Sequence, residues 1–286
     1  MRRSSIISIL ALLLPAFVIG SCPASEIKIA GSTVLLPAAQ TWAKSFPDKH
    51  PGQQVSVSGG GSAIGIKMLI EGKCDIALSS RQASVTERMA ARKRNIVLHR
   101  VDVAAEALAV VVHPSNHATG LSVAQLARIY SGDLKRWDRV GGAKGPIHPI
   151  GQDTGSVAYG FFDQVVMHGR PRSKTIAVWD PSRSVSSPDM ISLDKGAIAY
   201  CSPSLAGALA ETGRAAIIPI SDGKHTPAMW SPANIVTGNY PLSRVLCFYT
   251  RGKPAGTVKS FIDWCRKPEN DGPLLREFIY PCRPMD

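Results

Sequence analysis

From Glu26 to the end of the chain, short apolar runs alternate with amphipathic stretches, and this alternation limits the fold more than any other feature. Short apolar runs bounded by turn residues indicate buried strands, whereas apolar residues spaced three and four apart indicate helices. Strands that alternate with helices are typical of α/β architecture. Strands are predicted over residues 27–30, 54–57, 75–78, 107–112, 147–150, 197–200 and 244–249, and helices over residues 35–46, 63–71, 85–93, 123–131, 157–167 and 257–265.

The composition is that of a folded globular protein. The chain has 286 residues, of which 44% are hydrophobic and 19% are charged. At roughly 100 to 200 residues per domain, this length allows one large domain or two modest ones, each with a buried core. A disordered, collagen-like or coiled-coil chain is therefore not expected. The formal net charge of +12 leaves three kinds of partner open: nucleic acid, an anionic membrane surface or an anionic small ligand.

Residues 1–25 have the pattern of a secretory signal peptide. Arg2 and Arg3 precede an apolar run over residues 6–19, and small residues follow that run. The run is shorter than the roughly 20 residues that a membrane-spanning helix needs. We therefore predict a periplasmic or extracellular protein, for which nucleic acid is not an expected partner. Removal of Arg2 and Arg3 with the signal lowers the formal charge of +12 by two.

Two interpretations of the cleavage point remain open. Residues 19–22 read Ile-Gly-Ser-Cys, which resembles a lipoprotein box and predicts an acylated Cys22 at the mature N-terminus. Ordinary cleavage after Ala24 or Ser25 fits the same stretch. The first interpretation predicts a lipoprotein anchored at Cys22, and the second predicts a protein free in the periplasm.

Export places the cysteines where thiols tend to pair. The chain has six, and loss or acylation of the one in the signal region leaves five. Cys265 and Cys282 flank a short C-terminal segment, and a disulfide that closes a loop of this size contributes about 3 kcal/mol, so we predict this pair. A second pair of Cys201 with Cys247, which leaves Cys74 free, remains an alternative that the sequence does not establish.

No metal site or other cofactor is expected. No two cysteines have the spacing of metal ligands. His113 and His117 are four residues apart, but Pro114 between them argues against a shared helix face.

One local pattern recurs three times: a strand ends, small hydroxyl residues follow, and a helix begins. It occurs at residues 30–33, which include Ser32 and Thr33, at residues 59–62 and at residues 155–156. Each case places a hydroxyl and backbone N–H groups at the positive end of a helix dipole, where glycine allows a ligand close to the backbone. One such loop is an ordinary helix cap, but three together indicate a cradle for an anion.

A cation is expected at the same edge of the sheet. Ser80 and Arg81 follow the strand predicted over residues 75–78. Ligands of open α/β sheets gather at the carboxyl ends of strands. The guanidinium of Arg81 is thus a candidate partner for the anion.

At these loops the chain resembles the PstS-like phosphate-binding periplasmic proteins of ABC transporters. The resemblance extends in order over nearly all of the mature chain. It is carried by Gly31-Ser32-Thr33, Gly59-Gly60-Gly61-Ser62-Ala63-Ile64-Gly65-Ile66-Lys67, Glu71-Gly72, Asp75-Ile76-Ala77-Leu78-Ser79-Ser80-Arg81, Leu126-Ala127-Arg128-Ile129-Tyr130-Ser131-Gly132, Trp137, Gly141-Gly142, Gly196-Ala197-Ile198-Ala199-Tyr200, Tyr240-Pro241-Leu242-Ser243-Arg244 and Phe261-Ile262-Asp263.

The resemblance implies a type II periplasmic binding protein fold. Two α/β lobes, each a mixed sheet flanked by helices, are joined by two hinge strands. The first lobe is expected to combine residues 26–108 with residues 241–286, and the second to span residues 109–240. The lobes are expected to close on phosphate or a related oxyanion, which a monomeric protein without enzymatic activity delivers to an ABC permease in the inner membrane.

The resemblance also implies the ligand-binding residues. The loops above supply Ser32, Arg81 and Gly155. Matching positions of the family motifs add Thr33, the N–H of Val34, and the hydroxyls of Ser62, Ser80 and Ser156.

The chain departs from the family pattern in the loop of the second lobe. Gln152 stands where the family has an arginine, Ala158 where it has a threonine, and Tyr159 at a position that is often basic. Charged hydrogen bonds are about twice as strong as neutral ones, so these changes weaken the expected hold on a dianion.

Two interpretations of the ligand follow. In the first, Arg81 and the helix dipoles suffice and the ligand is phosphate. In the second, the site has moved toward a less charged ligand, such as a monoanion or arsenite, in an oxyanion sensor or accessory binding protein. A thiophilic ligand needs a cysteine in the cleft, and Cys201, directly after a predicted strand, is the candidate for that role.

An enzyme and an interaction module are two other classes of function. An enzyme would use Ser62, Ser80 or Ser156 as nucleophile with a histidine base, but the chain has no Gly-x-Ser-x-Gly elbow and no histidine in a recognisable catalytic context. An interaction module would bind an acidic envelope polymer through its basic surface without closure of the lobes. Neither class is required by any motif.

Overall fold

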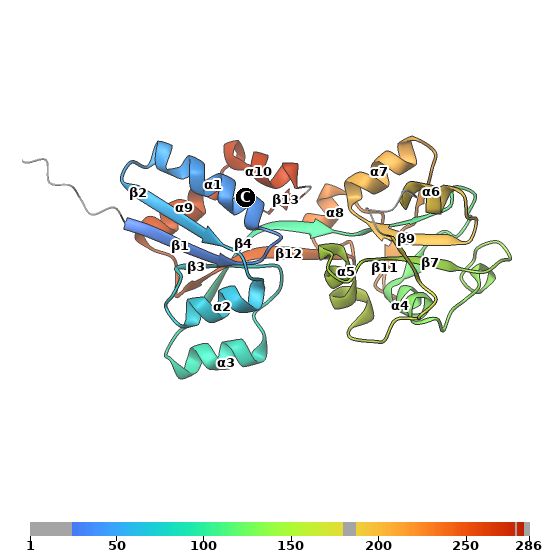
Figure 1. Ribbon diagram of the computed structural model, residues 1–286, viewed down its shortest axis with the longest axis horizontal. Coiled ribbons are helices and arrows are strands. Elements are labelled where there is room, and N and C mark those ends of the chain that lie inside the picture. The colour runs from blue at the N-terminus through green and yellow to red at the C-terminus, as the bar shows by residue number, and fades with distance from the viewer. Residues whose placement is uncertain (1–24, 180–186, 278, 283–286) are drawn as a thin grey trace, which may run out of the picture.

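The computed structural model describes residues 25–179, 187–277 and 279–282. The predicted signal peptide, with Cys22, lies outside these residues except for its last position, Ser25. The chain forms two α/β lobes that lie side by side and are connected by long strands (Figure 1). This arrangement confirms the two-lobed fold.

The first lobe is built on a six-stranded mixed sheet of order β13-β4-β12-β3-β1-β2. Strands β2, β1 and β3 run parallel, whereas β12 is antiparallel to both β3 and β4. The strands are β1 (Ser25–Gly31), β2 (Gln53–Ser58), β3 (Ile76–Ser79), β4 (Leu98–Ala107), β12 (Ser243–Arg251) and β13 (Tyr280–Pro281).

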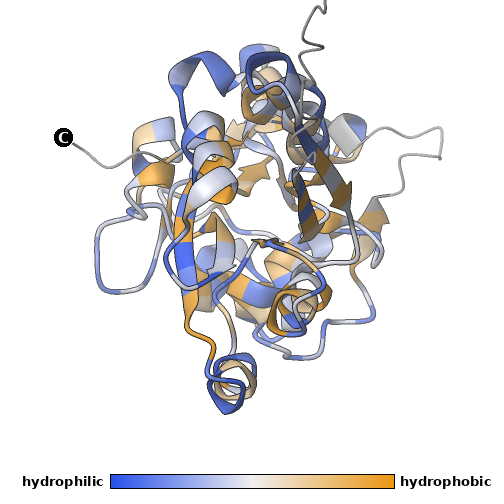
Figure 2. Cartoon of the chain, turned by 90° about the vertical axis from the view of Figure 1, so that its left-hand side faces the viewer, coloured by the Kyte–Doolittle hydropathy of each residue, from blue (hydrophilic) through white to orange (hydrophobic). Residues whose placement is uncertain are grey.

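Helices surround this sheet, and apolar side chains fill the space between. One cluster includes Trp42, Phe46 and Phe261, and another includes Ile66 and Leu69. Figure 2, in which the first lobe faces the viewer, shows apolar strands inside and hydrophilic helix faces outside. The helices are α1 (Leu36–Lys49), α2 (Ser62–Ile70), α3 (Val85–Lys93), α9 (Gly256–Cys265), α10 (Gly272–Arg276) and the 3₁₀ helix η3 (Pro268–Asn270).

The second lobe has its own mixed sheet, of order β10-β5-β9-β7-β8, and a small parallel pair, β11 with β6. Strand β7 is parallel to β8 and β9, and β5 is antiparallel to β9 and β10. The strands are β5 (Ala109–Val112), β6 (Leu121–Ser122), β7 (His148–Gln152), β8 (Ala177–Trp179), β9 (Ala197–Cys201), β10 (Ala216–Ile217) and β11 (Ile220–Ser221).

The helices of the second lobe bury an aromatic cluster that includes Tyr130, Phe162 and Tyr200. The single helix predicted over residues 157–167 is in fact an α-helix followed by a π-helix, which ends at His168 in the left-handed region. The helices are α4 (Val123–Ser131), the 3₁₀ helix η1 (Trp137–Arg139), α5 (Val157–Phe162), the π-helix η2 (Asp163–Met167), α6 (Ser187–Ser192), α7 (Pro203–Glu211) and α8 (Pro232–Val236).

The chain crosses between the lobes at two neighbouring points. Strand β4 continues into β5 with only Leu108 between them, so the predicted strand over residues 107–112 is divided between the two sheets. The return crossing precedes β12, at Leu242. The N–H of Leu108 donates to the carbonyl of Leu242 at 2.9 Å, which ties the two crossings together.

The predicted disulfide Cys265–Cys282 is not formed, because both residues are free thiols in this structure. Cys265 is buried in the core of the first lobe with Phe261, whereas Cys282 packs against the cluster of the second lobe and lines a cavity beside Arg266. The two thiols thus have different surroundings.

The alternative pair is not formed either. Cys201 is buried in the second lobe, and Cys247 is buried against α2 in the first. Their positions on separate sheets exclude a bond between them. Within the described residues, no helix combines the length and apolar character that crossing a membrane requires.

Candidate anion-binding site

Three parallel strands of the first lobe end at one edge of the sheet. Gly31 at the end of β1 is opposite Leu78 of β3, and Ala30 is opposite Ser58 at the end of β2. The N–H of Gly61 donates to the carbonyl of Gly31 at 2.8 Å, so the loop after β2 is held against the end of β1. The two anion loops expected in this lobe and the Ser80–Arg81 segment after β3 therefore converge.

Glycine is required where α2 approaches the end of β1. A Cβ on Gly65 would lie 2.6 Å from the carbonyl oxygen of Ala30, and a Cβ on Gly31 would lie 2.3 Å from that of Leu78. Gly31 also has a φ of +137°, which side chains disfavour. These two glycines let the first turn of α2 dock on the strand ends.

Ser62 and Ser80 form the centre of this edge. Ser62 is the first residue of α2, and its Oγ accepts a hydrogen bond from the N–H of Ser80 at 3.1 Å. The two hydroxyl oxygens are 3.3 Å apart, and both side chains are half-buried. Two hydroxyls at the N-terminus of a nine-residue helix can donate hydrogen bonds to an anion.

The first loop contributes less than expected. The N–H of Ser32 donates to the carbonyl of Leu78 at 2.9 Å, and Ser32 is buried. Thr33 is exposed, and Val34 packs against the core of the first lobe. Among these three residues, only Thr33 has a side chain open to a ligand.

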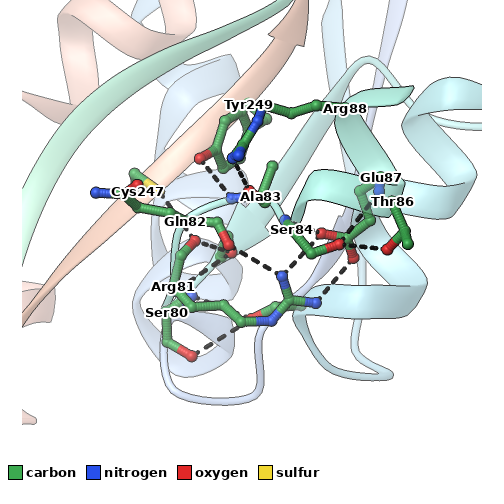
Figure 3. A network of polar contacts seen from close by, with 12 residues as sticks. Ser80, Arg81, Gln82, Ala83, Ser84, Thr86, Glu87, Arg88, Cys247 and Tyr249 are labelled. Carbon is green, nitrogen blue, oxygen red and sulfur yellow. Dashed lines mark hydrogen bonds and ion pairs between the residues drawn. The ribbon is translucent and has the colours of Figure 1, made fainter. Parts of the chain in front are cut away.

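Arg81 lies in the same loop as Ser80, but its charge is engaged (Figure 3). Its two terminal nitrogens donate to the two carboxylate oxygens of Glu87, each at 2.8 Å, and Nη1 also donates to the carbonyl of Gln82. The hydrogen bonds from Arg81 hold the pKa of Glu87 below its usual range. In this conformation Arg81 therefore faces α3.

The loop that carries Arg81 is fixed from the sheet side. The hydroxyl of Ser79 donates to the carbonyl of Arg81 at 2.7 Å, and the N–H of Ala83 donates to the Tyr249 hydroxyl at 2.9 Å (Figure 3). The N-cap of α3 completes the arrangement, because Glu87 and Ser84 cap each other. The position of Arg81 is thus set by both the sheet and the helix.

The anion loop of the second lobe joins β7 to α5. Ser156 caps α5, since its hydroxyl oxygen accepts from the N–H of Tyr159 at 3.0 Å. The N–H of Gly155 donates to the carboxylate of Asp153 at 2.8 Å. This N–H is expected to bind the ligand, yet in this conformation it is bound to a carboxylate of its own loop.

Gln152 does not replace the missing arginine directly. Its side-chain amide donates to the carbonyl of Tyr200 at 3.1 Å, and its backbone N–H donates to the Tyr200 hydroxyl at 3.2 Å. Ala158 is half-buried against the core. A charged side chain that did not stand out in the sequence, Arg172, contacts this same tyrosine hydroxyl. It follows the π-helix in a loop without periodicity, so no local pattern identifies it.

The structure groups the predicted residues in two sets. Ser32, Ser62 and Ser80 lie together at the edge of the first sheet, whereas Gly155 and Ser156 belong to the second lobe. Helix α5 is on the side of the second lobe nearest the first (Figure 1). Within the described part of the chain, no hydrogen bond joins the two sets.

Five cavities described for the structure are lined by other residues. One, of about 530 Å³, is lined by residues of β4, β12 and α9, among them Arg100, together with Cys282. Ser62, Ser80 and Ser156 line none of these five cavities.

Cys201 is a poor partner for a thiophilic ligand. It is buried in the core of the second lobe, and burial raises the pKa of its thiol to about 12. The thiolate that a soft ligand needs is therefore rare at neutral pH. The described part of the chain also holds no cluster of three or more histidine, cysteine or acidic side chains suited to a metal ion.

Comparison with known proteins gives one family. The model for the PBP superfamily domain matches residues 19–269. Protein SphX of Synechococcus elongatus is 28% identical over 257 residues, which cover 86% of this chain and 74% of that protein. The phosphate-binding protein PstS of Bacillus subtilis is 27% identical over 244 residues, which cover 85% of this chain and 76% of that protein. The structure of an ABC-type phosphate transport receptor from Vibrio cholerae is 25% identical, with a TM-score of 0.72 over 90% of this chain and 99% of that one.

Proposed function

The chain belongs to the PBP superfamily domain family, and from this membership we propose that it captures phosphate outside the cytoplasm and delivers it to an ABC permease. Relatives from Bacillus and Vibrio are named for phosphate binding and phosphate transport. They support uptake over the alternative of a sensor or accessory protein for a less charged oxyanion. The Bacillus relative is a binding protein by name, which supports a function without catalysis.

The observation that carries the proposal is the pair of Ser62 and Ser80. Their hydroxyls are 3.3 Å apart at the N-terminus of α2, on the edge where three parallel strands end. This edge offers hydroxyl donors and a helix dipole to an oxyanion. The net charge of the chain has no comparable bearing on the site, since most of it is spread over the surface.

Closure of the lobes completes the site in this proposal. Residues 26–108 with 241–286 form one body and residues 109–240 the other, and they rotate about Leu108 and Leu242. A buried oxyanion needs donors on all sides, so the closed form gains contacts from Ser156 that the open form lacks. Differential contact of this kind shifts a protein toward its closed state.

The place of action follows from the N-terminal segment. Residues 1–25 direct export in this proposal, and the mature protein works as a monomer in the periplasm. The lipoprotein-like residues 19–22 allow anchoring at Cys22 as the alternative to a free protein. Mass spectrometry of the mature N-terminus distinguishes a lipidated cysteine from an ordinary cleaved end.

Calorimetry on the mature protein tests the proposal. Phosphate and arsenate, sulfate and arsenite are titrated separately at neutral pH. Tight binding of phosphate, with arsenate close behind and sulfate and arsenite weak, supports phosphate capture. Absence of binding to every tetrahedral oxyanion overturns it, and a preference for arsenite supports the sensor alternative. Hydrolysis of a phosphomonoester that Ser62→Ala abolishes would instead indicate an enzyme.

A further inference from the structure

Arg172 is a largely but not fully buried cation in the second lobe. Its side chain is only 12% exposed, in the loop after η2. The guanidinium carbon lies 3.9 Å from the ring centre of Tyr159, 5.2 Å from that of Phe162 and 6.0 Å from that of Tyr200. Three aromatic rings therefore surround the charge, and a planar guanidinium is suited to such stacking.

The hydrogen bonds of Arg172 do not neutralise it. Nη1 donates to the Tyr200 hydroxyl at 3.1 Å and Nη2 to the carbonyl of Tyr159 at 3.3 Å, and both acceptors are uncharged. The carboxylate paired with it, on Asp163, is 3.8 Å away and 39% exposed. Nε is buried and has no hydrogen-bond partner in the described part of the chain. The positive charge of Arg172 is therefore only weakly neutralised by its neighbours. Arg81, in contrast, forms two hydrogen bonds to the carboxylate of Glu87.

Arg172 is connected to both ends of the anion loop. The Tyr200 oxygen that accepts from Arg172 also accepts the N–H of Gln152 at 3.2 Å. At the other end, the N–H of Tyr159 donates to the Ser156 hydroxyl, and the carbonyl of Tyr159 accepts from Arg172. Gln152 and Tyr159 occupy two positions where the family pattern predicts a basic residue. The guanidinium of Arg172 therefore lies behind the two positions at which this chain has no positive charge.

The Tyr200 hydroxyl is neutral, so it connects Arg172 to the loop without neutralising the positive charge. Burial raises the pKa of Tyr200, although the hydrogen bond from Arg172 acts in the opposite direction. A charge close to a site inside the protein is screened much less than one on the surface. Its field therefore reaches an anion held at the Gln152–Ser156 loop.

We propose that Arg172 supplies from behind this loop the positive charge that Gln152 does not, and so makes the second lobe selective for a doubly charged oxyanion. The inference rests on the proposed phosphate binding. Arg172 acts as a positioning and electrostatic residue through Tyr200 and the loop, and does not itself contact the ligand.

Phosphate calorimetry at pH 8 on five proteins tests the proposal. They are the wild type, Arg172→Gln, Arg172→Lys, the double variant Arg172→Gln with Gln152→Arg, and the control Arg170→Gln. Arg170 is exposed two residues away, so its variant loses the same formal charge. We expect about tenfold weaker binding for Arg172→Gln, recovery to within about threefold for Arg172→Lys and for the double variant, and no change for Arg170→Gln; tenfold corresponds to about 1.4 kcal/mol.

Recovery of phosphate binding in these two variants distinguishes an effect of the charge of Arg172 from an effect of its packing. If neither the lysine nor the arginine at position 152 restores binding while thermal unfolding is unchanged, Arg172 only supports the aromatic cluster and the proposal is wrong. Wild-type-like binding by Arg172→Gln also overturns it, and leaves phosphate capture intact. A wild type that does not bind phosphate overturns both.

A further variant covers the case in which Arg172→Gln does not fold. Tyr200→Phe keeps the ring and removes the oxygen that connects Arg172 to Gln152. We expect several-fold weaker phosphate binding with a native circular dichroism spectrum. Unchanged affinity would show that the charge does not act through this hydroxyl, and would overturn the proposal as stated.

Discussion

The guanidinium of Arg81 binds both carboxylate oxygens of Glu87, each at 2.8 Å. Glu87 also caps α3 by accepting from the N–H of Ser84 at 2.7 Å. The carboxylate of Glu87 thus caps the N-terminus of α3 and also binds Arg81, the side chain expected to contact the ligand. Arg81 can serve an anion only if its charge outweighs that of Glu87 at the ligand, or if closure separates the two.

Replacement of Glu87 by Gln tests the place of Arg81 in the site. The amide keeps an acceptor for Ser84 but removes the charge that neutralises Arg81, so we expect phosphate to bind several-fold more tightly by calorimetry. Glu71→Gln is the matched control, because Glu71 pairs with Lys73 at 2.7 Å at the other end of α2. Unchanged affinity in both variants, together with unchanged affinity in Arg81→Ala, would remove Arg81 from the site.

The same variant has a pH signature. The pKa of Glu87 is held below its ordinary value of 4.5 by hydrogen bonds from Arg81. Its stabilising contribution is therefore complete above 4.5 and is lost as the pH falls through the lowered native pKa. We expect the difference in urea midpoint between wild type and Glu87→Gln to be constant above pH 4.5 and to shrink as the pH is lowered further. A difference that stays the same below pH 4.5 would contradict the assignment.

Loss of either serine hydroxyl is expected to weaken phosphate binding. Ser62→Ala and Ser80→Ala each remove one donor, and a hydrogen bond to a charged group contributes about 1.5 to 3 kcal/mol. Calorimetry should therefore show a decrease in affinity of about ten- to a hundredfold. Ser45→Ala is the control, since this hydroxyl of α1 donates only to the carbonyl of Thr41. Equal affinities for all three variants would place the ligand elsewhere.

The contact of α2 with β1 predicts opposite effects for two helical glycines. Gly65→Ala forces a Cβ to within 2.6 Å of the Ala30 carbonyl, so we expect a loss of about 1 to 3 kcal/mol in the free energy of unfolding. Gly207→Ala in α7 meets no atom within 4 Å, so its better helix propensity should add up to about 1 kcal/mol. Urea denaturation measures both, and equal stability of the two variants would contradict the close approach.

The pair of Glu106 and Arg244 predicts strong coupling near the hinge. Their side chains are 14% and 10% exposed, with Arg244 Nε 2.6 Å from the carboxylate, and burial raises the pKa of Glu106. Glu106→Gln leaves Arg244 without its counter-charge, which should lower the free energy of unfolding by about 3 to 5 kcal/mol. The double variant Glu106→Leu with Arg244→Met should recover most of this loss. A double variant as unstable as the single one would argue against the pairing.

An exposed ion pair serves as the comparison for Glu106 and Arg244. Asp263→Asn is the control, since Lys259 and Asp263 form a pair with both side chains about half exposed. Exposed pairs contribute about 0 to 1 kcal/mol.

Thiol counting tests the cysteine assignments. A mature chain that begins after Cys22, unfolded without reductant, should react with five equivalents of Ellman's reagent, because all five cysteines are free. A count of three would show that one disulfide forms after all. In the folded protein we expect slow labelling that accelerates as the pH approaches 11, since burial raises the pKa of Cys282 and Cys74 to about 11.

Elements with their own local signals were predicted well. Helices α3 and α4 begin and end where expected, because Ser84 with Glu87 and Ser122 with Gln125 form capping boxes. The alternation of strands and helices also predicted α/β architecture, whereas the division into two lobes was implied by the family resemblance. These features depend on neighbours within a few residues, which a sequence displays directly.

Features that depend on distant residues were not predicted. Most of β4 was missed, since His99, Arg100 and Asp102 interrupt its apolar pattern while β12 pairs with it along its length. The prediction of the disulfide failed for the same reason, because it requires knowledge of which core cluster each thiol packs against. Arg172 meets Tyr200 across 28 residues, so no spacing rule connects them.

The position of β12 also determines the order in which the lobes can form. Strand β12 lies between β3 and β4, yet it is synthesised after the whole second lobe. All five strands of the second sheet are present once residue 217 has been made, whereas the first sheet lacks a central strand until residue 251. The sheet of the N-terminal lobe therefore gains its central strand only after every strand of the second sheet has been synthesised. A chain made in this order keeps the core of its first lobe incomplete until synthesis has passed the second lobe.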